Sequence, residues 1–207
     1  MLQNNDFCQS NYTMKLSKYI IAFLLLGTVI FIGCDDGKEV EFYLIQRTKD
    51  YFNFTDNTRW VYDVVSDSSH PVETYTLQNK IRNIRAEGNS EIMAYDLVRD
   101  AQYKINVRCE VGPTEFADRI SFLVEEGASK TVSAFVWAQT HRFYAENNDE
   151  INNIGADTLN GKAYQDVWQL KTKRNGDFKE IKFAKGYGLI YIDFKDGRKL
   201  CLKELNK

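Results

Sequence analysis

The chain has 207 residues, with 27 Lys plus Arg against 29 Asp plus Glu and a formal net charge of −2. This balance disfavours nucleic-acid binding through a basic patch, because such binding depends on Lys and Arg neutralising phosphates. Abundant aromatic residues (14%) and only two prolines indicate a folded rather than a disordered protein. The length fits one domain, with or without appendages.

An uncharged apolar run occupies residues 20–33 and follows Lys15 and Lys18. The run is shorter than the roughly 20 residues that a helical membrane span needs. Cationic residues before a short apolar run are typical of a secretory signal peptide. We therefore expect a signal peptide over residues 14–33, with an uncleaved anchor helix as the alternative. The signal begins at a methionine, so residues 1–13 are interpreted as an upstream start artefact.

The apolar run ends in Phe-Ile-Gly-Cys at residues 31–34. This tetrapeptide resembles the lipobox of bacterial lipoproteins, although Phe31 stands where Leu is usual. The resemblance implies diacylation of Cys34, with palmitate among the acyl groups, and cleavage before it. Two or more acyl chains hold a protein on a membrane durably, whereas one chain binds only marginally. We therefore expect Cys34 to anchor the chain to a membrane of the bacterial cell envelope.

The lipidated cysteine would be followed at once by Asp35 and Asp36. Such acidic residues resemble an inner-membrane retention signal of enterobacteria, or a surface-export signal of the Bacteroidota, or they are an ordinary solvated tether. The outer membrane is favoured, and its periplasmic or surface face stays open. We assign residues 34–49 to the lipidated cysteine and its tether, or in part to a first strand. Residues 50–207 are expected to form a single β-rich domain.

Alternating apolar and polar residues, rich in aromatic and β-branched types, predict strands in the first half of this domain. Turn-forming clusters separate the successive segments. The expected strands are residues 59–65, 72–84, 91–99 and 103–109.

The middle of the domain is less regular. Residues 114–126 fit a helix or a strand, and we favour the strand. Residues 131–137 are another expected strand, whereas residues 141–160 are polar and Asn-rich and are expected to form a long loop with a short strand.

Glycine-containing turns punctuate the last part of the chain. Asn175-Gly176 and Asp196-Gly197 predict hairpins, because these pairs adopt positive φ readily. The whole pattern gives roughly eight to ten strands with turns about every ten residues, which indicates an all-β antiparallel sheet, curved into a half-barrel, barrel or sandwich. The expected strands are residues 164–173, 178–185, 189–194 and the stretch through Leu200 and Leu202.

Two phrases bracket the domain: YFNF…NTRWVY over residues 51–62, and GKAYQDV followed by IKFAKGYGLI over residues 161–190. Together they resemble a broad group of uncharacterised envelope lipoproteins of the Bacteroidota. The resemblance implies an antiparallel, strongly curved sheet, akin to lipocalin-like barrels or lipoprotein-carrier half-barrels, and implies no activity. We favour a structural role for both phrases, in which their aromatic rings cover the sheet and their glycines allow it to bend. The departures from the group pattern are Asn53 for Pro, Asn57 for Gly and Tyr187 for Val.

Motifs of catalysis and metal binding are sparse. No nucleophile elbow, phosphate-binding loop or dinucleotide fingerprint occurs. His70 has no neighbouring residue that could share a metal ion with it. His141 has acidic residues near it, so a metal site there is an alternative, although an ordinary loop histidine is favoured. The carboxylate pairs 125–126 and 149–150 could serve a hydrolase, but solvated surface is favoured. We expect no catalytic residue, no metal and no cofactor.

Two cysteines remain after processing, Cys109 and Cys201. An oxidising envelope permits a disulfide between them. Cys109 shares an apolar strand face, whereas Cys201 lies on the face opposite Leu200 and Leu202. We therefore favour two separate thiols over a bridge.

A non-enzymatic binding or structural module is the function that these features favour. Trp60, Trp137 and Trp168 are the candidate lining of an apolar ligand pocket, with a lipid or other apolar small molecule as its ligand. The expected partners are the membrane, through the acyl chains on Cys34, and such a ligand or an envelope protein, with no nucleic acid. The alternatives are an accessory subunit that docks on another envelope complex, and a hydrolase.

Overall fold

The computed structural model describes residues 41–65, 69, 71–85, 88–112, 116–124, 131–173 and 176–207. Within these ranges no helix is both long and apolar enough to cross a membrane. Several expectations lie outside the described residues: the start artefact, the signal peptide, Cys34 with Asp35 and Asp36, His70, the pair 125–126, and Asn175.

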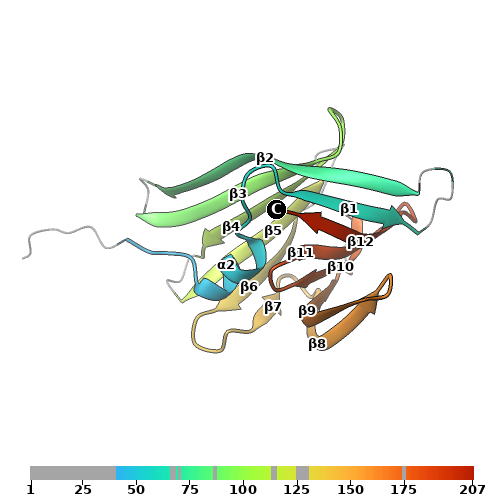
Figure 1. Ribbon diagram of the computed structural model, residues 1–207. Coiled ribbons are helices and arrows are strands. Elements are labelled where there is room, and N and C mark those ends of the chain that lie inside the picture. The colour runs from blue at the N-terminus through green and yellow to red at the C-terminus, as the bar shows by residue number, and fades with distance from the viewer. Residues whose placement is uncertain are drawn as a thin grey trace, which may run out of the picture. The chain divides into compact units, whose positions relative to one another are not determined.

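The described residues form one short helix and twelve strands that join in a single antiparallel sheet (Figure 1). The elements are α2 (Gln46–Phe52), β1 (Arg59–Val64), β2 (Val72–Arg85), β3 (Ser90–Val98), β4 (Lys104–Val111), β5 (Ala117–Val124), β6 (Val132–Trp137), β7 (Phe143–Ala145), β8 (Glu150–Leu159), β9 (Lys162–Lys171), β10 (Phe178–Ala184), β11 (Gly188–Phe194) and β12 (Lys199–Asn206).

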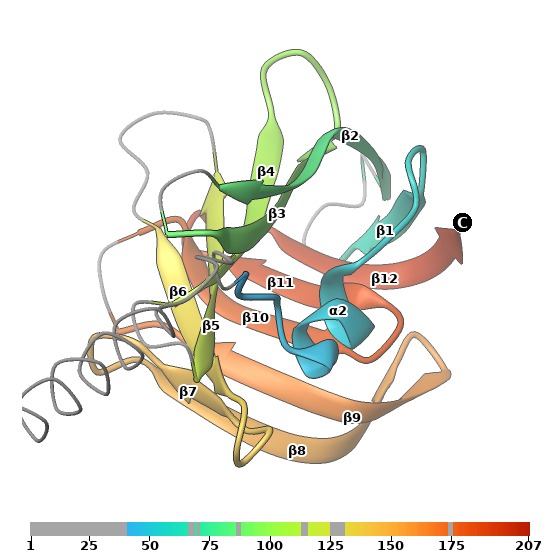
Figure 2. The ribbon, with the colours of Figure 1, turned by 90° about the vertical axis from the view of Figure 1, so that its left-hand side faces the viewer.

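The sheet runs in the order β7-β6-β5-β4-β3-β2-β1-β12-β11-β10-β9-β8. Strands β1 to β7 form one half, strands β12 to β8 form the other, and the β1–β12 ladder joins them. The sheet curls into a nearly closed barrel, seen end-on in Figure 2. The expected all-β antiparallel class is thereby confirmed, and the barrel-like curvature excludes a sandwich of two sheets for the described residues.

The alternation seen in the sequence accounts for the inner face of the barrel. Trp60, Tyr62 and Val64 of β1 are buried, and their neighbours Val61 and Asp63 are only partly so. A strand places successive side chains on opposite faces, so a period of two buries one row. The strands expected over residues 59–65, 72–84, 91–99 and 103–109 are confirmed with shifts of one or two residues at their ends.

Two expectations in the middle of the chain are resolved. Residues 114–126 contain strand β5 and no helix within the described part. The long loop expected over residues 141–160 is wrong, because this stretch contains β7 and the ten-residue strand β8. Strand β8 pairs only with β9, and its side chains are exposed or half-buried, so no apolar alternation marks it.

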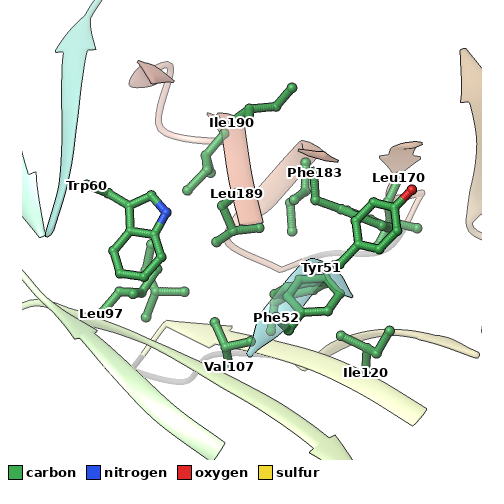
Figure 3. Close-up of a cluster of buried hydrophobic side chains, with 14 of the residues drawn as sticks. Tyr51, Phe52, Trp60, Leu97, Val107, Ile120, Leu170, Phe183, Leu189 and Ile190 are labelled. Atoms are coloured by element: carbon green, nitrogen blue, oxygen red, sulfur yellow. The ribbon is translucent and has the colours of Figure 1, made fainter. Parts of the chain in front are cut away.

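Helix α2 lies inside the ring of strands (Figure 2). Tyr51 and Phe52 are fully buried there, and Figure 3 shows them between side chains of the two halves of the sheet. The Phe52 ring centroid lies 5.8 Å from that of Phe122 and 5.4 Å from that of Phe183. The helix therefore fills the barrel interior, and we call it the plug helix.

The segment before the plug helix packs on the barrel as well. Phe42 forms a parallel bridge with Ser90, and Leu44 is buried. Residues 41–207 form one compact unit. Residues 41–49, which the sequence pattern assigned to a tether or first strand, thus belong to the folded domain, because Leu44 and the plug helix fill space that the strands leave between them.

The two bracketing phrases of the sequence meet in space. The indole Nε1–H of Trp60 donates to the carbonyl oxygen of Tyr187 at 2.9 Å, and the Phe54 ring packs edge-on against Trp60 at 4.9 Å. Gly188 has a φ of +68°, and a Cβ there would lie 2.9 Å from Phe54 Cε2. This packing gives both phrases a structural role in the scaffold.

Candidate functional site

The barrel has a seam where its two end strands, β7 and β8, lie without a hydrogen-bonded ladder between them. The chain turns between these strands, where Asp149 N–H donates to the carbonyl oxygen of Glu146 at 3.2 Å. An open pocket of about 890 Å³ lies at this seam and is lined by Arg47 of the plug helix, by β7 and β8, and by Trp168 of β9. The seam pocket is our candidate functional site.

Arg47 lies within an aromatic frame at the seam. Its guanidinium carbon lies 5.5 Å from the ring centroid of Tyr51 and 5.7 Å from those of Phe143 and Trp168. Its Nη2 donates to both carboxylate oxygens of Asp166, at 3.0 and 3.2 Å. Cation–π contacts and a carboxylate partner together hold a partly desolvated guanidinium in one orientation.

Asp166 is itself in an unusual backbone conformation. Its φ is +51°, and the β8–β9 register shifts around Gly155, opposite this part of β9. Its carbonyl oxygen accepts a hydrogen bond from the Tyr51 hydroxyl at 2.9 Å. Burial, followed by the nearby Asp166 side chain, raises the pKa of Tyr51 far above its usual range, so the hydroxyl stays protonated as a donor. The irregular strand thereby fastens the plug helix at the seam.

Two buried donors at the seam lack a hydrogen-bond partner among the described residues: Arg47 Nε and Trp168 Nε1. The Trp168 indole acts to lower the pKa of the Tyr51 hydroxyl, but the larger effect of burial raises it. The indole Nε1–H itself makes no hydrogen bond of normal geometry. An unsatisfied buried donor costs about 1–3 kcal/mol. A ligand or solvent oxygen at the seam would remove this cost.

One lysine contacts both acidic residues of the pocket. Asp149 accepts the backbone N–H of Lys173 at 3.0 Å, and Glu150 lies 2.6 Å from Lys173 Nζ. The hydrogen bond from Lys173 lowers the pKa of Glu150. A glycosidase general acid requires a raised pKa, so the direction found for Glu150 is opposite to the one that role needs.

His141 also lines the seam pocket. It lies in a loop and has a φ of +52°. Within the described part of the chain, no group of three or more His, Cys, Asp or Glu side chains is placed to bind a metal ion.

The three tryptophans that the sequence suggested as one pocket occupy different places. Trp60 is in the core with 1% of its surface exposed, and Trp137 is 40% exposed at the end of β6. Of the three, Trp168 is the one that lines the seam pocket. Sequence reasoning missed Arg47 and Asp166, since no local pattern connects two residues 119 positions apart.

Buried carboxylates position the plug helix that carries Arg47. Asp118 Oδ2 accepts the backbone N–H of Ile45 at 2.8 Å and the hydroxyl of Thr48 at 2.5 Å. Burial raises the pKa of Asp118 to about 6, against the opposing effect of these hydrogen bonds. The helix therefore has a fixed start, although it has no side-chain cap of its own.

Glu91 holds the segment just before the helix. It accepts the N–H of Leu44 at 2.9 Å and pairs with Lys49 at 2.9 Å and Arg82 at 2.7 Å. Burial acts to raise the pKa of Glu91, but these hydrogen bonds outweigh burial and lower it. Glu91 is therefore a charged clamp on the plug segment.

Cys109 and Cys201 are both free and buried. Cys109 belongs to the buried row of β4, and Cys201 alternates with Leu200 and Leu202 of β12. This agrees with the two separate thiols that the strand faces predicted.

No protein-family profile and no curated protein matches the chain. Two solved structures show a distant likeness. One is described as an outer membrane lipoprotein-sorting protein domain from Vibrio parahaemolyticus, with 6% identity over 78% of this chain and 88% of that chain, and a TM-score of 0.23. The other is a DUF1329 family protein from Desulfovibrio piger, with 8% identity, 71% of each chain covered and a TM-score of 0.22. At these TM-scores neither likeness carries an argument about this protein.

Proposed function

We propose that this chain is a lipid-anchored protein of the bacterial envelope, of the Bacteroidota type, whose barrel is a non-enzymatic module that binds its ligand in the seam pocket. The anchor follows from the signal peptide over residues 14–33 and the lipobox ending at Cys34. The binding role follows from one observation: the barrel is open at the seam, where Arg47 and Trp168 each have a donor without a partner.

The filled interior supports a site at the seam rather than along the barrel axis. A carrier of lipid needs a preformed, mostly apolar cavity. Here Tyr51 and Phe52 occupy the space between the two halves of the sheet. The seam pocket has aromatic surfaces beside Arg47, Asn152 and Asn153. This lining favours a ligand with acceptor oxygens and a flat apolar face over a wholly apolar one.

The anchor is tested by labelling cells with an alkyne analogue of palmitate. The wild-type chain should incorporate the label, and a Cys34→Ala variant should not. Equal labelling of the two proteins would contradict the anchor.

The site is tested by native mass spectrometry of the full lipidated protein in mild detergent. Asn152→Trp would fill the pocket, whereas Thr158→Trp places the same side chain on the same strand, at an exposed position that does not line it. We expect a bound mass on the wild type and on Thr158→Trp, reduced about tenfold on Asn152→Trp, which corresponds to a loss of about 1.4 kcal/mol. A wild type without bound mass, or equal occupancy in all three, contradicts the proposal.

A further inference from the structure

Four aromatic residues of the described chain are at least 40% exposed, and three of them gather at one end of the barrel, the fourth being Tyr144 of β7. Tyr43 is 59% exposed, Phe116 is 54% exposed and Trp137 is 40% exposed. We call these three residues the aromatic rim. Large aromatic side chains are costly to leave in water and are enriched where a protein meets a membrane interface.

Hydrogen bonds show that the rim residues share one end. Ala138 N–H donates to the carbonyl oxygen of Phe116 at 2.8 Å, and Trp137 pairs with Ala117 across the β5–β6 ladder. Ile45, two residues after Tyr43, donates its N–H to Asp118, two residues after Phe116. This is the end at which the chain enters the barrel, as Figure 2 shows from that side.

The opposite end has no such rim among its described residues. Val65, 61% exposed, follows the last residue of β1, and Val72, 45% exposed, begins β2. These are small aliphatic side chains in the turn region between two strands. The two ends therefore differ in their exposed aromatic residues, which lie at the rim end.

Two cationic residues lie near the rim. Lys49 Nζ lies 5.8 Å from the Tyr43 ring centroid, but its charge is already paired with Glu91 at 2.9 Å. The backbone N–H of Trp137 donates to the carbonyl oxygen of Arg142 at 3.3 Å, so Arg142 lies beside the rim. Aromatic residues beside the exposed Arg142 suit the headgroup region of a bilayer that contains anionic lipid.

The chain length before the rim restricts the orientation. Eight residues lead from Cys34 to Phe42, and a fully extended chain of that length spans about 28 Å. The eight-residue strand β4 alone rises about 26 Å. An anchor at Cys34 thus keeps the rim end close to the membrane, and the tether barely suffices to bring the far end there instead.

We propose that the aromatic rim rests on the bilayer into which the acyl chains of Cys34 insert, so that the barrel stands with its plug-helix end toward the lipid. This inference rests on the proposed anchor. It assigns the rim a partner, the surface of a phospholipid bilayer, and gives Trp137 an interfacial role that the sequence had attributed to a ligand pocket.

The test uses the full lipidated protein in vesicles of phosphatidylethanolamine and phosphatidylglycerol, with or without brominated acyl chains that quench tryptophan. Flotation comes first, and failure to float with the vesicles overturns the anchor and the orientation together. In floated protein we expect brominated lipid to reduce the emission by up to about a third, because Trp137 is one of three tryptophans. This quenching should disappear in Trp137→Phe.

A matched variant keeps the test specific. Adding Val65→Trp to Trp137→Phe places an exposed tryptophan at the far end of β1, and we expect brominated lipid to leave its emission unchanged. Floated protein without quenching of Trp137, or equal quenching at positions 137 and 65, overturns the orientation while the anchor stands. A photocrosslinker at position 137 that captures an envelope protein instead of lipid in cells overturns it as well.

Discussion

Arg47 Nη2 lies 3.0 Å from one carboxylate oxygen of Asp166 and 3.2 Å from the other, and this contact joins the plug helix to strand β9. The side chains are 23% and 33% exposed. The pair is thus partly desolvated, so it has more influence than a surface ion pair and less than a fully buried one. It fixes the plug at the one place where the strand ladder of the described barrel is open.

Replacing Asp166 by Asn tests this contact. Asn tolerates the positive φ of residue 166, so the substitution removes charge without adding backbone strain. We expect Asp166→Asn to lower the free energy of unfolding by about 1–2 kcal/mol, because Arg47 loses its counter-ion. Urea denaturation of the single variants and of Asp166→Asn with Arg47→Met gives a double-mutant cycle. A coupling energy near zero would mean that the pair does not fasten the plug.

Phe52 should be the most costly side chain of the plug helix to truncate. It is fully buried between Phe122 and Phe183, so Phe52→Ala leaves a cavity that costs about 3–5 kcal/mol. Phe116→Ala removes the same atoms from a residue that is 54% exposed, and we expect a change within about 0.5 kcal/mol. Equal effects of the two variants in denaturant melts would refute a packed plug.

Glycine can be required at a position by a positive φ or by the lack of space for a Cβ, and Gly186 and Gly188 allow these two causes to be compared. Both have positive φ, but a Cβ on Gly188 would lie 2.9 Å from Phe54 Cε2, whereas one on Gly186 meets nothing within 4 Å. We expect Gly186→Ala to cost about 1 kcal/mol from backbone strain. Gly188→Ala should cost about 2–4 kcal/mol, since strain and steric overlap act together. The same cost for both, measured by urea denaturation, would show that Phe54 moves aside freely.

Asp118 gives the domain a pH dependence of unusual sign. Burial raises its pKa to about 6 in the folded protein, above the ordinary value of 3.8. The folded state therefore binds this proton more tightly than the unfolded state, and the stability from this group is full below about pH 4 and lost as pH rises through 6. The difference amounts to about 3 kcal/mol.

Asp118→Asn isolates this effect, because Asn keeps an acceptor oxygen for Ile45 and Thr48 but cannot ionise. The difference in unfolding free energy between variant and wild type, followed from pH 4 to pH 8, should shift in favour of the variant as pH rises. Parallel curves across that range would exclude a raised pKa for Asp118.

The two thiols should be unreactive in the folded protein. Burial raises the pKa of both Cys109 and Cys201, which leaves little thiolate for reaction. We expect a chromogenic disulfide reagent to label both only after denaturation, and a reductant to leave Tm unchanged. Recovery of a 109–201 disulfide peptide under non-reducing conditions would refute this.

Local patterns in the sequence determined most of the strands. Alternation fixed β1 and β4, because a strand with one buried face must carry apolar residues at every second position. The same rule failed for β8, whose ten residues include no buried one. The side chains of this edge strand are at most partly buried against the core, so the strand needs no continuous apolar row and its sequence resembles a loop.

The strand content could be read from the sequence, since a period of two is a local feature. The signal peptide and the anchor at Cys34 remain predictions from local features of the same kind. The plug helix could not be read from the sequence. Its seven residues are too few for a helical period, and Asp118 and Glu91, which hold its start, come from strands far along the chain. The seam pocket likewise depends on Arg47 meeting Asp166 and Trp168. Only the closure of the sheet through β1 and β12 brings these residues together, and no local pattern encodes a contact between segments that are distant in the sequence.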